Sequence, residues 1–271
     1  KIRIFFIPLL FLILILSGCV KEYGMEDTEN TVDENLIVVG VSQVGSESVW
    51  RTANTASIQN ILTKENGYFM IFNNARQKQE NQIKALRSFI SQRVDYIVFS
   101  PITEDGWETV LQEAKEAGIP VILIDRKVKL SDQSWIGSDF YKEGRMAGNI
   151  LDEYLTKQHR QEESIRIVVL QGTEGATATI GRTNGFNEVA EAHENWLILE
   201  QADGEFTTAK GQEEMEMLLH RYKDIDVVIS QNDDMTFGAL TAIQNAGLTA
   251  GEDGDIIVLD EGIVMGLLLY H

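Results

Sequence analysis

The sequence predicts an α/β fold with two lobes, each built on a parallel sheet with helices packed against it. Apolar runs of strand length alternate along the chain with stretches in which apolar residues recur every three or four positions, as on one face of a helix. Strands that are separated by helices pair in parallel. Runs such as Val121–Ile124 and Ile256–Leu259 are apolar throughout, which is typical of strands buried on both faces.

The order of the predicted elements places a crossing between the lobes near Gly137, Ser138 and Asp139, because one full set of strand and helix units precedes this segment and another follows it. We therefore predict an N-terminal lobe at residues 36–138 and a C-terminal lobe at residues 139–271. The nine predicted strands are 36–41, 68–72, 96–100, 121–124, 135–137, 165–170, 196–199, 226–230 and 256–259.

Composition and charge narrow the classes of function. The 271 residues are 44% hydrophobic and 24% charged, which is an ordinary balance for a folded protein. The formal net charge of −19 argues against nucleic-acid binding, because a protein surface must be basic to displace counterions from phosphate. Such a protein is suited to neutral or cationic small molecules.

The N-terminus has the pattern of a secretory signal. Lys1 and Arg3 precede an apolar run, Ile4–Leu16, that is shorter than the roughly 20 residues needed to span a bilayer. The ending Leu-Ser-Gly-Cys resembles the lipobox of bacterial lipoproteins, which implies cleavage before Cys19 and lipid attachment to its sulfur. The alternative is an apolar N-terminus with an incidental cysteine. We predict a signal peptide at 1–18, a flexible tether at 19–35, and a chain anchored at the outer face of the cytoplasmic membrane.

Polar side chains follow most of the predicted strands. Because ligands of open parallel sheets bind beyond the carboxyl ends of the strands, these side chains are candidates for a binding site. They are Trp50 and Arg51 after the first strand, Ser100 after the third, Asp125 and Arg126 after the fourth, Gln171 after the sixth, Gln231–Asp234 after the eighth and Asp260 after the ninth.

Asp125 and Arg126 are adjacent, so in extended backbone their side chains diverge instead of pairing with each other. An aspartate accepts and an arginine donates two hydrogen bonds, which suits the neighbouring hydroxyls of a sugar. Trp50 and Phe206 could pack on the C–H face of a sugar ring. The alternative is that Asp125 and Arg126 are surface charges at a strand end, and these residues alone do not decide between the two.

Sequence motifs that are typical of phosphate-binding, catalytic or metal sites are absent from the sequence or have a simpler explanation. There is no dinucleotide-binding glycine pattern, no Walker motif, no nucleophile elbow and no metal-ligand spacing among the four histidines. The glycine-rich stretch 171–181 fits neither phosphate pattern and suggests a loop that a ligand approaches closely. Asp233 and Asp234 could form a metal or acid–base pair, but a helix start explains them better. We expect no cofactor, no metal and no enzymatic activity.

Several stretches in one order resemble the type I periplasmic sugar-binding proteins of bacterial ABC transporters, in the ribose- and galactofuranose-binding group. The stretches that carry the resemblance are VGVSQVGSESVWR, QKQENQIKALRSFISQRVDYIVFSP, GIPVILIDR, LQGTEGATATIGRTNGF, DGEFTTAKG and QNDDMTFGALTAIQNAGL. The resemblance implies two Rossmann-like lobes that close on one sugar. The residues that it assigns to the ligand are Trp50, Arg51, Asp125, Arg126, Arg182, Phe206, Asn232 and Asp260.

The resemblance also implies a function. We expect a monomeric lipoprotein that captures a monosaccharide, with galactofuranose as the expected sugar, and delivers it to an ABC permease. An alternative is a binding lipoprotein that presents its ligand to a membrane histidine kinase or chemoreceptor. The effector domain of a transcription regulator would need a DNA-binding segment where this chain has its export signal.

The resemblance is incomplete at the C-terminus. Members of the family usually continue well beyond the aspartate that matches Asp260, cross back between the lobes and complete the first one, whereas this sequence reads to His271. We therefore expect the final strands of the first lobe to be missing, with apolar surface left uncovered there.

Overall fold

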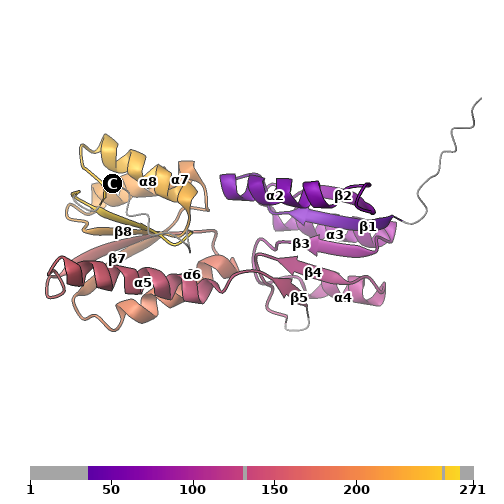
Figure 1. Ribbon diagram of the computed structural model, residues 1–271, viewed down its shortest axis with the longest axis horizontal. Coiled ribbons are helices and arrows are strands. Elements are labelled where there is room, and N and C mark those ends of the chain that lie inside the picture. The colour runs from indigo at the N-terminus through magenta and orange to yellow at the C-terminus, as the bar shows by residue number, and fades with distance from the viewer. Residues whose placement is uncertain (1–35, 131–132, 252–253, 263–271) are drawn as a thin grey trace, which may run out of the picture. The chain divides into compact units, whose positions relative to one another are not determined.

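The computed structural model describes residues 36–130, 133–251 and 254–262, and its strands form two parallel sheets (Figure 1). The first sheet has the order β2-β1-β3-β4-β5 and the second the order β7-β6-β8-β9. The predicted α/β fold with two parallel sheets is confirmed. The strands are β1 (Ile37–Gln43), β2 (Tyr68–Asn74), β3 (Tyr96–Phe99), β4 (Val121–Ile124), β5 (Ser134–Ile136), β6 (Ile165–Gln171), β7 (Trp196–Asp203), β8 (Val227–Ser230) and β9 (Ile257–Asp260).

Helices follow the strands in the predicted alternation. Three strands extend by two or more residues beyond their predicted ends: β1 continues through Ser42 and Gln43, β2 continues through Asn73 and Asn74, with which they pair, and β7 continues to Asp203. Apolar periodicity misses these ends because their side chains are polar. The helices are α2 (Val49–Ile61), α3 (Gln79–Gln92), α4 (Glu108–Glu116), α5 (Phe140–Lys157), α6 (Thr177–Ala190), α7 (Thr208–Arg221) and α8 (Asp233–Asn245).

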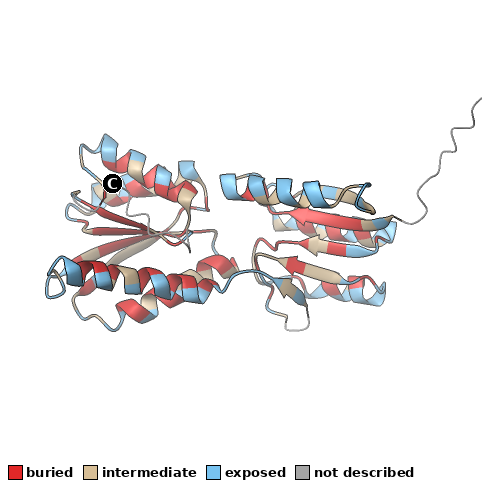
Figure 2. Cartoon of the chain, in the orientation of Figure 1, coloured by how far each residue is buried: buried red, intermediate tan, exposed pale blue. Residues whose placement is uncertain are grey.

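The second sheet has an apolar core on each face. On one side, α7 and α8 pack against residues such as Val168 and Val258, and on the other, α5 and α6 pack against Ile167 and Ile257 (Figure 2). Strand β9 is therefore buried on both faces, as its apolar run predicts.

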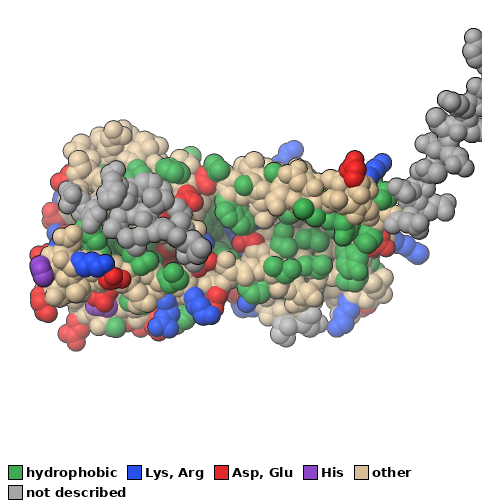
Figure 3. Space-filling model, viewed as in Figure 1, with side chains coloured by type: hydrophobic (Ala, Val, Ile, Leu, Met, Phe, Trp, Pro, Cys, Tyr) green, Lys and Arg blue, Asp and Glu red, His purple; other side chains and the backbone are tan. Residues whose placement is uncertain are grey.

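The first sheet has a large apolar core on one face only. Phe89 of α3 packs where a side chain at Gly40 would stand, so Val39 and Val41 point to the opposite face. Their in-register neighbours on that face, Tyr96 and Phe72, are exposed, and hydrophobic side chains gather over this sheet in Figure 3. The prediction that strand Val121–Ile124 is buried on both faces is wrong, because only Leu123 is buried.

The helix that follows β1 adds little apolar cover to the first lobe. Arg51 is the one buried residue of α2, and the large side chains of Trp50 and Ile61 on the same helix are exposed. A small cluster of Val44, Ala75 and Ile102 lies near the start of this helix. The second sheet has an apolar core on both faces. The first sheet has a large one on one face only, and the helix α2 of that lobe is held mainly by polar contacts.

Some sequence predictions lie outside the described residues. These are the signal peptide, Cys19 and the tether, together with residues 263–271. Among the helices that the structure describes, none combines the length and the apolar character needed to cross a membrane. The sheets divide the chain between β5 and β6, and the lobe boundary at residues 138 and 139 stays a prediction.

Candidate ligand-binding site

A cavity of about 260 Å³ lies beyond the carboxyl ends of the strands and is lined by residues that follow strands of both sheets. Seven of the eight predicted ligand residues line the cavity. The eighth, Asp260, does not line it, but its Oδ1 accepts the N–H of Gly262, which does. The lining residues are Glu47, Ser48, Trp50, Arg51, Asp125, Arg126, Ser138, Phe140, Glu143, Ala178, Arg182, Phe206, Asn232, Asp233, Asp234 and Gly262. That these side chains contact a ligand stays a prediction.

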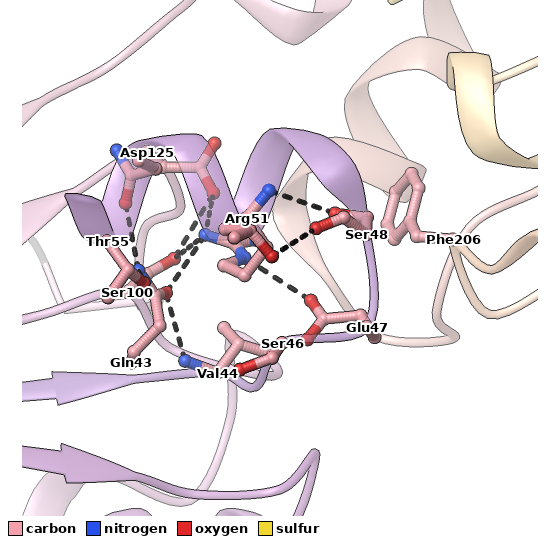
Figure 4. Close-up of polar contacts among 12 residues, drawn as sticks. Gln43, Val44, Ser46, Glu47, Ser48, Arg51, Thr55, Ser100, Asp125 and Phe206 are labelled. Atoms are coloured by element: carbon pink, nitrogen blue, oxygen red, sulfur yellow. Dashed lines mark hydrogen bonds and ion pairs between the residues drawn. The ribbon is translucent and has the colours of Figure 1, made fainter. Parts of the chain in front are cut away.

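Arg51 is the centre of the hydrogen-bond network in the first lobe (Figure 4). The hydroxyl of Ser48 accepts the Arg51 N–H at 3.0 Å and begins α2, which places the arginine on its first turn. Arg51 Nη1 donates to Asp125 Oδ2 at 3.0 Å and to Gln43 Oε1 at 3.2 Å, and Nε donates to Glu47 Oε1 at 3.3 Å. The guanidinium also lies 4.8 Å from the ring centroid of Trp50. Arg51 is thus held from three sides before any ligand binds.

The backbone at Asp125 differs from the extended geometry that we predicted. Asp125 has a φ of 64°, in the left-handed region, which costs a non-glycine residue about 1 kcal/mol or more. Its N–H donates to Ile136 O at 2.8 Å, and Trp135 Nε1 donates to its carbonyl at 3.1 Å. This turn aims the carboxylate at Arg51, with the adjacent Arg126 Nε 4.0 Å away.

Arg126 is buried at the boundary of the cavity. Its Nη1 donates to Ile102 O at 3.0 Å, and its guanidinium carbon lies 5.1 Å from the ring centroid of Phe206. Burial, with a smaller contribution from the charge of Arg51, lowers the pKa of Arg126 to about 10, so that it stays charged at neutral pH. In the described part of the chain, Arg126 Nε and the carboxylate oxygen Oε2 of Glu47 are buried without a hydrogen-bond partner.

Phe206 reaches the cavity because Gly172 leaves room for its ring. A Cβ atom at Gly172 would lie 1.9 Å from the nearest ring atom of Phe206. The prediction that the glycine-rich stretch 171–181 admits a ligand therefore needs correction at this position, because the glycine admits a side chain of the protein. Ala178 and Arg182, from the helix that follows, do line the cavity.

The second lobe contributes one arginine and the start of a helix. Arg182 donates to the buried carboxylate of Glu143 from Nε at 3.0 Å, and Nη2 lies 2.9 Å from the same oxygen. Asn232 caps α8, because its Oδ1 accepts the N–H of Met235 at 3.0 Å. The helix-start explanation of this segment is confirmed. Within the described residues no group of three or more metal-ligating side chains occurs.

Two carboxyl groups lie at the end of β9, of which Asp260 is half-buried and Glu261 is buried. Thr236 Oγ1 is 2.5 Å from Asp260 Oδ2, and both carboxyl oxygens of Glu261 are buried without a partner among the described residues. Burial raises the pKa of Asp260 well above its usual range and raises the pKa of Glu261 to about 8. Arg182 opposes the shift at both groups, and the neighbouring carboxylates add to it.

The sequence prediction missed three acidic residues of this site: Glu47, Glu143 and Glu261. Glu47 and Glu261 stand within four residues of a strand's carboxyl end, and the strand-end pattern that found Asp125 could have found them too. Glu143 lies one turn into α5, away from any strand end, and the one signal beside it is Gly144, a glycine inside a helical run that indicates a close contact.

Comparisons with known proteins add to this geometry. The sequence profile of the periplasmic binding protein domain matches residues 39–265. The chain is 40% identical over 220 residues to the galactofuranose-binding protein YtfQ of Escherichia coli, which covers 80% of this chain and 69% of that protein. It is 31% identical to the ribose import binding protein RbsB of Bacillus subtilis, and the match spans 62% of that protein.

A solved structure is also similar to this chain. A Mycobacterium smegmatis protein in complex with β-D-fucofuranose is 44% identical, with a TM-score of 0.78, over 83% of this chain and 73% of that one.

Proposed function

This chain belongs to the family of periplasmic binding proteins, and we propose that it captures one monosaccharide between its lobes and delivers it to an ABC permease. The resemblance to the type I members of this family is confirmed by the matches over most of the chain. Members of the family bind solutes, so the prediction that the chain is not an enzyme is confirmed as well. The family is therefore established, and the identity of the bound solute is what we propose.

One observation carries the proposal: the cavity boundary holds a buried acceptor and a buried donor that lack partners. Glu47 Oε2 needs a hydrogen-bond donor and Arg126 Nε needs an acceptor, since a buried polar atom without a partner costs about 1–3 kcal/mol. A hydroxyl group both donates and accepts. Both residues line the cavity, so a ligand with several neighbouring hydroxyls can satisfy both kinds of atom once the two side chains turn toward it.

The size and the walls of the cavity support a sugar. Its volume of about 260 Å³ lies below the 300–1,000 Å³ that is usual for drug-sized ligands and is suited to a small one. Trp50 and Phe206 offer aromatic faces at the cavity, and each is already approached by an arginine. A polyol ring with one apolar face matches this combination.

Galactofuranose is the first candidate ligand. The names of the relatives support a furanose, because YtfQ is a galactofuranose-binding protein and the similar solved structure holds fucofuranose. Closure of the two lobes on the sugar would be the mechanism, and no bond would be made or broken. Anchoring through Cys19 at the outer face of the cytoplasmic membrane, and action as a monomer, are part of the same proposal.

The test is thermal melting and titration calorimetry of the purified chain with galactofuranose, fucofuranose, arabinose, galactose, ribose and glucose. A ligand at 100 times its dissociation constant should stabilise the folded state by about 2.7 kcal/mol. We expect a clear rise in Tm with one of the furanoses. A cooperative melt that no sugar shifts would contradict the proposal.

A further inference from the structure

We propose that Glu143 is a positioning residue that fixes one edge of the Arg182 guanidinium and so leaves the other edge for the ligand. This inference rests on the proposed function, since it assigns a role within the same site.

The inference begins with the close crossing of α5 and α6. A Cβ atom at Gly144 would lie 2.0 Å from the carbonyl oxygen of Arg182, and one at Gly185 would lie 2.1 Å from that of Tyr141. Backbone approaches backbone this closely only because both positions are glycine. The crossing brings the first turn of α5 beside the middle of α6, and Glu143 beside Arg182.

The contact between Glu143 and Arg182 fixes an orientation as well as a distance. Nε and Nη2 of Arg182 lie 3.0 and 2.9 Å from the same oxygen, Oε2 of Glu143. The two side chains are 11% and 6% exposed, so water competes weakly for this pair. The ring of Phe140, with its centroid 5.2 Å from the guanidinium carbon, limits the arginine on another side.

The remaining edge of the arginine is available to a ligand. Among the described residues, Nη1 of Arg182 has no hydrogen-bond partner, and Arg182 lines the cavity. A guanidinium whose Nε edge is occupied can present only this edge to the cavity.

Without Glu143, the arginine has another acceptor to turn toward. Glu261 lies close enough for the charge of Arg182 to lower its pKa, and both oxygens of Glu261 lack a partner in the described chain. We therefore expect removal of the Glu143 charge to redirect Arg182 away from the ligand.

The same pair of helices supplies a matched control. Arg145 of α5 and Glu188 of α6 form a second ion pair across the crossing, at 3.6 Å, with side chains 48% and 45% exposed. Neither residue lines the cavity. Glu188→Gln therefore removes an arginine–glutamate pair between the same helices without touching the site.

The test measures Kd by calorimetry for the sugar that the unchanged chain binds, in Glu143→Gln, Arg182→Met, the double variant and Glu188→Gln. We expect Glu143→Gln to weaken binding about tenfold and Glu188→Gln to leave it unchanged. In the Arg182→Met background, Glu143→Gln should have less than a twofold effect, because its partner is gone. Equal weakening in both backgrounds would show that Glu143 acts independently of Arg182, through the fold or through its own contact with the ligand, and would overturn the inference.

A second measurement does not depend on the ligand. The ¹H–¹⁵N NMR signal of Arg182 Nε should be protected from exchange with water in the unchanged chain and in Glu188→Gln, and should lose this protection in Glu143→Gln. A protected signal in Glu143→Gln would overturn the inference even if that variant binds weakly. Failure of the unchanged chain to bind any sugar, with the protection pattern as expected, would overturn the proposed function and the ligand part of this inference, and would leave the positioning of Arg182 established.

Discussion

The two sheets of this protein are covered in different ways, although the chain builds them by the same alternation of strand and helix. The second sheet lies between two apolar clusters, whereas the first has one large cluster on the α3 and α4 side and exposed aromatic residues on the other (Figure 2). The first lobe holds α2 through the polar network of Arg51. In the first lobe, the candidate site and the anchoring of α2 therefore depend on the same polar network, whereas in the second lobe the site shares Phe140, Ala178 and Phe206 with an apolar core that many other residues complete.

The largest expected effect comes from opening the core of the second lobe. Phe186 is 1% exposed and stacks on Trp196 with ring centroids 6.3 Å apart. Phe186→Ala should lower the free energy of unfolding by about 3–5 kcal/mol. Phe72→Ala, at a position 36% exposed on the first sheet, should lower it by about 1 kcal/mol or less. Urea denaturation followed by circular dichroism measures both, and equal losses would remove the contrast between the lobes.

The next effect comes from breaking the polar network of the first lobe. Arg51→Met leaves the carboxylates of Glu47 and Asp125 without their arginine and should cost about 3 kcal/mol. Because α2 has no other buried residue, hydrogen exchange should show its amides losing protection before those of α6. If the amides of α2 keep their protection in this variant, the network is not what holds the helix.

Stability should also depend on pH through Glu261. Its pKa is raised to about 8 in the folded state by burial, so the folded state holds a proton that the unfolded chain releases above about pH 4.3. The group is neutral in both states well below that pH. At higher pH the carboxyl ionises in the unfolded chain but stays protonated in the folded state, so the free energy of unfolding falls as the pH rises to about 8 and levels off above it.

Glu261→Gln should remove this loss. We expect the free energy of unfolding of the variant to exceed that of the unchanged chain by a few kcal/mol at pH 9 and to match it near pH 4. Denaturation at the two pH values measures the difference, with the exposed Glu188→Gln as the control. A difference that does not change with pH would contradict the buried, neutral state of Glu261.

The smallest expected effects come from removing one helix N-cap in each lobe, and they test whether only the cap in the first lobe supports the binding site. Ser48 and Thr207 are N-caps of α2 and α7, accepting backbone N–H groups at 3.0 and 3.2 Å. Ser48→Ala and Thr207→Ala should each cost about 1 kcal/mol of stability. Only Ser48→Ala should also weaken sugar binding, because its helix start carries Arg51. Equal effects on Kd would show that the site does not depend on this cap.

The sequence predicts most of the fold because strands and helices have local signatures. All nine strands lie where apolar runs predict them, and polar residues after the strands identify Asp125, Arg126, Asn232 and Asp260. The partly exposed face of the first sheet, where Val39 and Val41 are buried but Tyr96 and Phe72 are not, could not be predicted in this way, because an apolar run such as Val121–Ile124 does not tell what covers it.

Contacts between residues that are far apart in the sequence are the second limit on what the sequence predicts. Glu143 meets Arg182 only because two glycines let α5 and α6 cross closely, and Asp125 meets Arg51 only through a left-handed turn. The turn has no signature near the residues that it brings together, whereas the crossing has one in Gly144 and Gly185, which stand beside Glu143 and near Arg182.

The most direct test of this account is hydrogen exchange of the purified chain with and without galactofuranose. A ligand that satisfies Glu47 and Arg126 completes the network that holds α2. The account predicts that the sugar protects residues 49–61 more strongly than any helix in the core of the second lobe. No change at α2 on binding, or equal protection throughout the chain, would contradict it.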